Sequence, residues 1–176
     1  MPASWLFRAV LFFAVCLVAT AAAAKHPAGL ETGQHPPDYL GRSTDGDKLY
    51  VADSAGQILV VTFWASWCAP CLKELPILNA IQKKAGANRV RVVAINLKES
   101  RKQFRKVMRA LEDYEINFVH DERGSVAKDY RVKGVPNLFI IDVDGRIAFR
   151  HVGYSDAALG RIVEDINSLL VKNQLH

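Results

Sequence analysis

Two cysteines, Cys68 and Cys71, are separated by two residues, and this spacing suits thiol–disulfide exchange. In such a pair, the first thiolate attacks a disulfide of another protein and the second cysteine then releases that protein. A structural zinc site would need about four ligands, and the one other cysteine of the chain is Cys16. Haem attachment needs a histidine directly after the pair, where this chain has Leu72. A purely structural disulfide gains little from so short a loop. We therefore interpret the pair as a redox dithiol.

A buried strand before the pair and a helix after it are predicted to position the two cysteines. Residues Ile58–Trp64 are mostly apolar or β-branched, which is typical of a strand buried on both faces. Apolar residues at helical spacing, from Leu72 to Ile81, follow the second cysteine. Pro70 suits the first turn of that helix, where a backbone N–H has no partner. The pair would then lie at a helix N-terminus, where unpaired amides and the helix dipole can lower a thiol pKa from about 8.5 to roughly 3.5–7.5.

The remaining sequence alternates between strand and helix patterns, and this alternation indicates the fold class. Apolar residues on both sides of an Asp45-Gly46 turn predict a β-hairpin near the start of the folded region. We predict an α/β fold with a mixed central sheet, helices on both faces and an N-terminal β-hairpin extension. The other expected elements are strands at 90–96, 116–119, 138–141 and 146–152, and helices at 69–84, 100–113, 125–130 and after Ser155.

Residues 1–24 have the pattern of a signal peptide. Arg8 precedes an apolar run, and the small residues Ala22-Ala23-Ala24 form a cleavage pattern before Lys25. The uncharged stretch is short for a spanning helix, which needs roughly 17–25 residues. We therefore expect cleavage, with a retained membrane anchor as the alternative. Export predicts a periplasmic or other extracytoplasmic location, which is oxidising, and membrane contact is expected only if residues 1–24 are retained.

The rest of the chain is expected to form one domain. We interpret residues 25–36 as a linker or irregular arm, 37–172 as the domain and 173–176 as a tail. The formal net charge of +5 is mild. Basic residues gather between Arg101 and Arg109, where they alternate with apolar residues at helical spacing, as on a solvated helix face. No motif for base stacking or groove binding accompanies them, so we expect no nucleic-acid partner.

The motif residues together resemble a known family. The string from Phe63 to Pro76, which contains both cysteines and Glu74, is similar to the TlpA/ResA group of exported thioredoxin-like thiol–disulfide oxidoreductases. Gly134-Val135-Pro136 before a later strand, and Pro37-Asp38-Tyr39 before the hairpin, resemble the same group. The likeness covers Pro36 to Leu170 and keeps the order of elements. It implies a thioredoxin-like fold.

The resemblance also implies roles for individual residues. Cys68 would attack the partner disulfide, Cys71 would resolve the mixed disulfide and Glu74 would handle protons. Pro136 would follow a cis peptide bond and border the site, and Val135 and Trp67 would contribute to substrate binding at its rim. From the residues alone, Glu74 shares a helix face with Cys71, and an ordinary solvated carboxylate is the alternative interpretation.

The family is mostly reducing, so the resemblance implies a reductase of disulfides in exported partner proteins such as apocytochrome c. A membrane thiol–disulfide electron donor would keep it reduced, and we expect no cofactor and no metal. One alternative is a disulfide oxidase or isomerase of the same fold. Another is a copper-binding thioredoxin-like chaperone, in which His120 or His151 would be a third ligand. Those copper proteins have three residues between their cysteines, whereas this chain has two.

Overall fold

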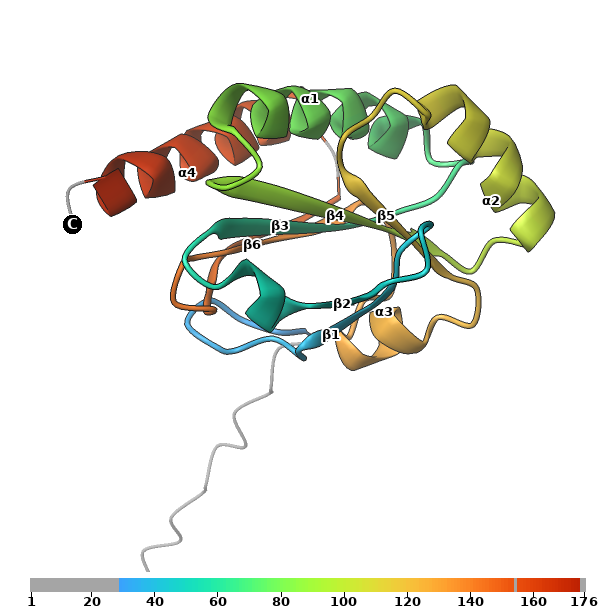
Figure 1. Cartoon of the computed structure of the whole chain (residues 1–176), viewed down its shortest axis with the longest axis horizontal. Coiled ribbons are helices and arrows are strands. Elements are labelled where there is room, and N and C mark those ends of the chain that lie inside the picture. Colours follow the sequence, from blue (N-terminus) through green and yellow to red (C-terminus); the bar gives the residue numbers. More distant parts are fainter. Residues whose placement is uncertain (1–28, 154, 175–176) are drawn as a thin grey trace, which may run out of the picture.

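The computed structural model describes residues 29–153 and 155–174, so the expected signal segment 1–24 and the end of the expected tail lie outside the described residues. A small hairpin precedes a chain of alternating strands and helices (Figure 1). The elements are β1 (Tyr39–Arg42), β2 (Lys48–Tyr50), the 3₁₀ turn η1 (Val51–Ser54), β3 (Ile58–Trp64), α1 (Ala69–Ala85), β4 (Val90–Leu97), α2 (Arg101–Met108), the 3₁₀ turn η2 (Arg109–Leu111), β5 (Asn117–Asp121), α3 (Ser125–Asp129), β6 (Asn137–Ile141), β7 (Ile147–Val152) and α4 (Asp156–Gln174).

The main sheet has five strands in the order β5-β4-β3-β6-β7. Strands β3, β4 and β5 are parallel, whereas β6 runs antiparallel to β3 and β7 antiparallel to β6. Every residue of the central strand β3 is buried, which explains why its sequence is apolar on both faces. The predicted mixed α/β sheet with an N-terminal hairpin is confirmed.

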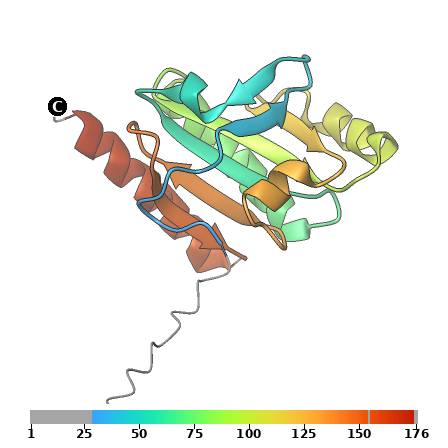
Figure 2. The same ribbon diagram turned by 90° about the horizontal axis from the view of Figure 1, so that it is seen from below.

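The sheet is covered on both faces. Helices α1 and α4 lie on one face, and the β1–β2 hairpin and α3 lie on the other (Figures 1 and 2). Side chains of β3 alternate between two hydrophobic clusters, with Val60 and Trp64 on the α1 side and Val61 and Phe63 on the hairpin side. Because the period is two, Thr62 lies on the same face as Val60 and Trp64, beneath α1.

The predicted starts of α2 and α4 are confirmed, whereas α2 ends earlier than predicted. Ser100 and Gln103 form the expected capping box at the start of α2, and the Ala158 N–H donates to Ser155 Oγ over 3.0 Å before α4. The α-helical part of α2 ends at Met108 rather than continuing to residue 113, because the chain tightens there into η2. Such 3₁₀ turns are common at the ends of helices.

The described part of the expected arm packs on the sheet. Leu30 is buried, and backbone hydrogen bonds join Gly33 and Gln34 to Ile147 at the start of β7. These contacts extend the folded part of the chain to residues before Pro37. Within the described ranges, no helix has the length and apolar character needed to cross a membrane.

Candidate active site

The two cysteines form a disulfide at the junction between β3 and α1. Their sulfur atoms are 2.07 Å apart and their Cα atoms 5.3 Å apart. Cys68 is the N-cap residue of α1, and its Sγ accepts a hydrogen bond from the Cys71 N–H over 3.3 Å. Cys68 retains 5% exposure and Cys71 has none. The first sulfur therefore lies at the outer, positive end of the helix dipole, which favours its thiolate once the pair is reduced.

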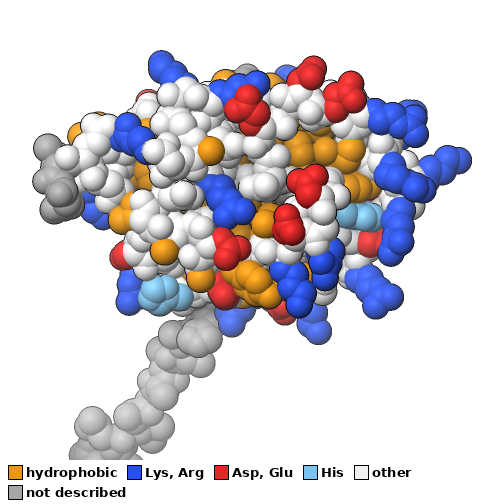
Figure 3. Space-filling view, in the orientation of Figure 1, with side chains coloured by type: hydrophobic (Ala, Val, Ile, Leu, Met, Phe, Trp, Pro, Cys, Tyr) orange, Lys and Arg blue, Asp and Glu red, His pale blue; other side chains and the backbone are white. Residues whose placement is uncertain are grey.

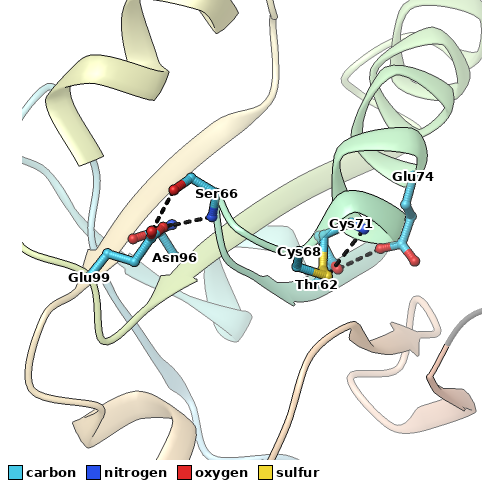
Figure 4. Close-up of a disulfide and its surroundings, with 7 residues drawn as sticks. All are labelled: Thr62, Ser66, Cys68, Cys71, Glu74, Asn96 and Glu99. Carbon is cyan, nitrogen blue, oxygen red and sulfur yellow. Dashed lines mark hydrogen bonds between the residues drawn. A yellow bond between two sulfur atoms is a disulfide. The ribbon is translucent and has the colours of Figure 1, made fainter. Parts of the chain in front are cut away.

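Glu74 lies one turn further along α1 and is buried, with 3% exposure. Its carboxylate is directed toward β3 beside the disulfide (Figure 4), where Thr62 Oγ1 donates to Oε1 over 2.6 Å. Desolvation by burial raises the pKa of Glu74 above its ordinary value, and the smaller opposing effect is the hydrogen bond from Thr62. The carboxylate is thus not on the solvated face of the helix. A buried carboxylate with a raised pKa binds a proton more readily than a solvated one, which suits it to accept a proton from a neighbouring group.

Trp67 directly precedes Cys68, and the Val135–Pro136 segment leads into β6, the strand next to β3. The Val135–Pro136 peptide bond is cis, as the family resemblance implies. Because Phe63 pairs with Asn137 across β3 and the antiparallel β6, this register places Pro136 opposite Trp64 at the end of β3. Val135 lies just beyond, where the turn toward Cys68 begins. Pro136 is buried and Val135 is half-buried, whereas the indole of Trp67 is 71% exposed.

A second buried carboxylate, Glu99, holds the turn that leads into the cysteine pair. It accepts hydrogen bonds from the Ser66 N–H over 2.7 Å, from Ser66 Oγ over 2.5 Å and from Asn96 Nδ2 over 2.6 Å (Figure 4). These bonds fix the residue before Trp67 to the end of β4. The roles of Glu99, Ser66, Asn96 and Thr62 were not predicted from the sequence. One signal was available, because Thr62 interrupts an otherwise largely apolar strand.

The two histidines considered as copper ligands are engaged elsewhere. His120 stacks on Phe104 with ring centroids 4.5 Å apart, and its Nε2 is 2.7 Å from the Glu99 carbonyl oxygen. His151 Nε2 is 2.8 Å from the carboxylate of Asp165. In the described ranges, no group of three or more His, Cys, Asp or Glu side chains is arranged to hold a metal ion.

Comparison with known proteins identifies the family. The model of the Redoxin family matches residues 31–170, which include the whole site described above. The chain belongs to the Redoxin family. This Redoxin chain is 33% identical over 131 residues to the thioredoxin-like protein YneN of Bacillus subtilis strain 168, covering 73% of this chain and 76% of that protein. It is 29% identical over 120 residues to the thiol-disulfide oxidoreductase ResA of Bacillus thuringiensis subsp. konkukian, covering 67% and 68%.

Solved structures of similar proteins support the same family assignment. The crystal structure of a Chlorobium tepidum protein assigned as thiol:disulfide interchange protein DsbE has a TM-score of 0.72 and 31% identity, covering 80% of this Redoxin chain and 99% of that one. The exposed lipoprotein thioredoxin Etrx1 of Streptococcus pneumoniae has a TM-score of 0.63 and 28% identity, covering 75% and 99%. The resemblance to TlpA/ResA-like proteins is thereby confirmed. The Redoxin chain is a thiol–disulfide oxidoreductase with a thioredoxin fold.

The buried carboxylate makes the stability of this Redoxin protein depend on pH. Because the folded-state pKa of Glu74 is raised, its favourable contribution is present at low pH and is lost as pH rises through that pKa. Glu74→Gln keeps an oxygen that can accept from Thr62 and removes the buried charge. We expect this variant to be more stable than wild type above that pKa by about 1–3 kcal/mol, and the difference to shrink as pH falls. Urea unfolding of the oxidised proteins across pH measures both curves, and parallel curves would refute the assignment.

Proposed function

We propose that this chain is an exported reductase that delivers two electrons from the Cys68–Cys71 dithiol to disulfides of exported partner proteins. The observation that carries the proposal is the asymmetry of the pair. Cys68 caps the helix and keeps a little exposure, whereas Cys71 is fully buried one turn from the buried carboxylate of Glu74. Attack and resolution can therefore be divided between the two sulfurs.

The first step is attack by Cys68. Its thiolate, favoured by the N-terminus of α1, forms a bond to one sulfur of the partner disulfide, and the bond between the two partner sulfurs breaks. The electron pair of the broken bond leaves on the second partner sulfur, which takes a proton from water. Trp67, Val135 and Pro136 would border the Cys68 sulfur and contact the partner segment that carries the mixed disulfide.

The second step is resolution by Cys71. Its thiol is surrounded by apolar side chains, which raise a thiol pKa, so it needs a proton acceptor. Glu74 on the same helix face would take the proton. The Cys71 thiolate then attacks Cys68 Sγ, the partner leaves with both of its cysteines reduced, and the chain is left with the intramolecular disulfide. Sulfur atoms carry both electrons, so the exchange requires no cofactor.

A dithiol donor must return the chain to its reduced form. We assign this role to a membrane thiol–disulfide electron donor, and the substrate role to apocytochrome c or similar exported proteins, as the family resemblance implies. The signal pattern of residues 1–24 supports an extracytoplasmic location, with a membrane anchor if the segment is retained. Residues 37–172 would form the catalytic domain, 25–36 an arm before it and 173–176 a tail.

The reduction potential of the cysteine pair tests the direction of transfer. The full chain is equilibrated with glutathione buffers of graded potential, and its reduced fraction is read from the mass added by an alkylating reagent. A reductase should have a midpoint near that of thioredoxin, about −270 mV, whereas an oxidase should have one near about −120 mV. A midpoint at the oxidising end would reverse the proposed direction.

A further inference from the structure

A groove of about 600 Å³ opens next to Trp67, the residue before Cys68. Its apolar lining includes Trp67, Leu97 and Val135. Trp67 precedes Cys68 and Val135 precedes Pro136 in the chain, so the groove adjoins the segment that carries the pair, although neither cysteine lines it. It extends from the carboxyl ends of β3 and β4 toward the segment that follows α3, which is the edge of a parallel sheet where ligands usually bind.

The remaining side chains of the groove give it a strong positive charge. Lys98, Lys128, Arg131 and Lys133 line it, and its lining contains no Asp or Glu. All four side chains are exposed. Among the described residues, none of the four forms an ion pair, whereas Arg101 on α2 is paired with Glu122 over 3.1 Å. In the part of the chain that the structure describes, therefore, no carboxylate pairs with the cations of the groove.

Two of these cationic residues have an unusual backbone conformation. Lys98 and Arg131 both have a positive φ of 54°, and they are the two non-glycine residues with this conformation in the described ranges. The stem of Lys98 lies across Gly124, where an added Cβ would collide with Lys98 Cε. Left-handed backbone at non-glycine residues is unfavourable and gathers at functional sites. It occurs twice in the lining of this one groove.

We propose that this groove binds an acidic polypeptide segment flanking the disulfide of the partner. The inference rests on the proposed reductase function and names its substrate class. Apolar side chains of the segment would lie on Trp67 and Val135, while its carboxylates would face the lysines and the arginine at the rim. Opposite charges would raise the local concentration of such a segment and its association rate by roughly 10–10³-fold.

A second basic surface supplies the matched control. Lys and Arg side chains also gather over α2 (Figure 3), where Lys102 and Lys106 are exposed and lie outside the groove lining. Lys128→Glu with Lys133→Glu, and Lys102→Glu with Lys106→Glu, change the net charge of the chain equally. Only the first pair changes the groove.

The test uses the reduced full chain and three synthetic peptides with the same disulfide loop. The residues flanking the loop are glutamate, glutamine or lysine. The second-order rate constant of disulfide reduction is measured for each peptide at low and at high ionic strength. We expect the ratio of the glutamate to the glutamine peptide to be at least about tenfold at low salt, and to collapse at high salt because the rim is solvent-exposed.

The two double variants then show which basic surface causes the preference for the glutamate peptide. The ratio should fall to one or below in the groove variant and persist in the α2 variant, and using a ratio removes any general change in activity. Loss of preference in both variants, or equal rates for all three peptides in wild type, would overturn the inference. Failure to reduce any peptide would instead overturn the reductase proposal. Should the groove variant misfold, Lys128→Gln with Lys133→Gln replaces it, with the same expected loss of preference.

Discussion

Cys68→Ser and Cys71→Ser should each reduce the turnover of a model disulfide to less than about one thousandth of the wild-type rate, because each removes one of two sulfurs that act in sequence. Cys68→Ser removes the attacking thiolate. Cys71→Ser leaves the attack intact but blocks release of the partner, so the enzyme stops after one encounter. Steady-state reduction of a protein disulfide, with a chemical dithiol as donor, measures the loss.

The third cysteine of the chain provides the control for this pair of variants. Cys16 lies in the expected signal segment, so Cys16→Ser in the full chain should retain wild-type turnover. Substantial turnover by either Cys68→Ser or Cys71→Ser would contradict the dithiol mechanism.

Glu74→Gln should slow the second chemical step and spare the first. Attack by Cys68 depends on the helix terminus, which the substitution does not change. Resolution requires Cys71 to lose its proton inside an apolar cluster, and proton transfer by a positioned side chain is typically worth about 10²–10⁴-fold. We expect resolution to slow by at least about tenfold, the mixed disulfide to accumulate, and the pH dependence of resolution to move upward. Rapid quenching with acid, followed by mass analysis, separates the two steps.

An exposed glutamate offers the matched control for this substitution. Glu164 lies on the solvent side of α4, and Glu164→Gln removes the same charge without touching the site, so both steps should keep their rates. If Glu74→Gln slows the initial attack and leaves resolution unchanged, the carboxylate acts on Cys68 or on partner binding. Unchanged rates in both steps would remove Glu74 from the mechanism.

Local patterns were sufficient to predict the elements that present the cysteines. The apolar run Ile58–Trp64 and the helical spacing after Cys71 are short-range signals, and they placed the pair at the strand-to-helix junction that the structure shows. The cis bond before Pro136 came from the family resemblance, because an X-Pro bond in a folded protein is cis only about 5–6% of the time.

Features that need several distant segments could not be read from the sequence. Its spacing places Glu74 on the same helix face as Cys71 but leaves a solvated carboxylate possible, because its burial depends on α1 packing over Thr62 of β3. Glu99 becomes a structural carboxylate only because β4 brings it to Ser66. The positive groove likewise combines residues from four places in the chain, among them Trp67 and Lys128. Tertiary packing, which spacing does not encode, decides each of these environments.

Trapping the mixed disulfide tests the central claim most directly. Reduced Cys71→Ser and Cys68→Ser proteins are each mixed with an oxidised partner protein, quenched with acid and analysed by peptide mass spectrometry without reduction. The mechanism predicts that Cys71→Ser becomes linked to the partner through Cys68, and that Cys68→Ser forms little or no linked product. A stable link through Cys71 in the Cys68→Ser protein, with none through Cys68 in the other variant, would contradict it.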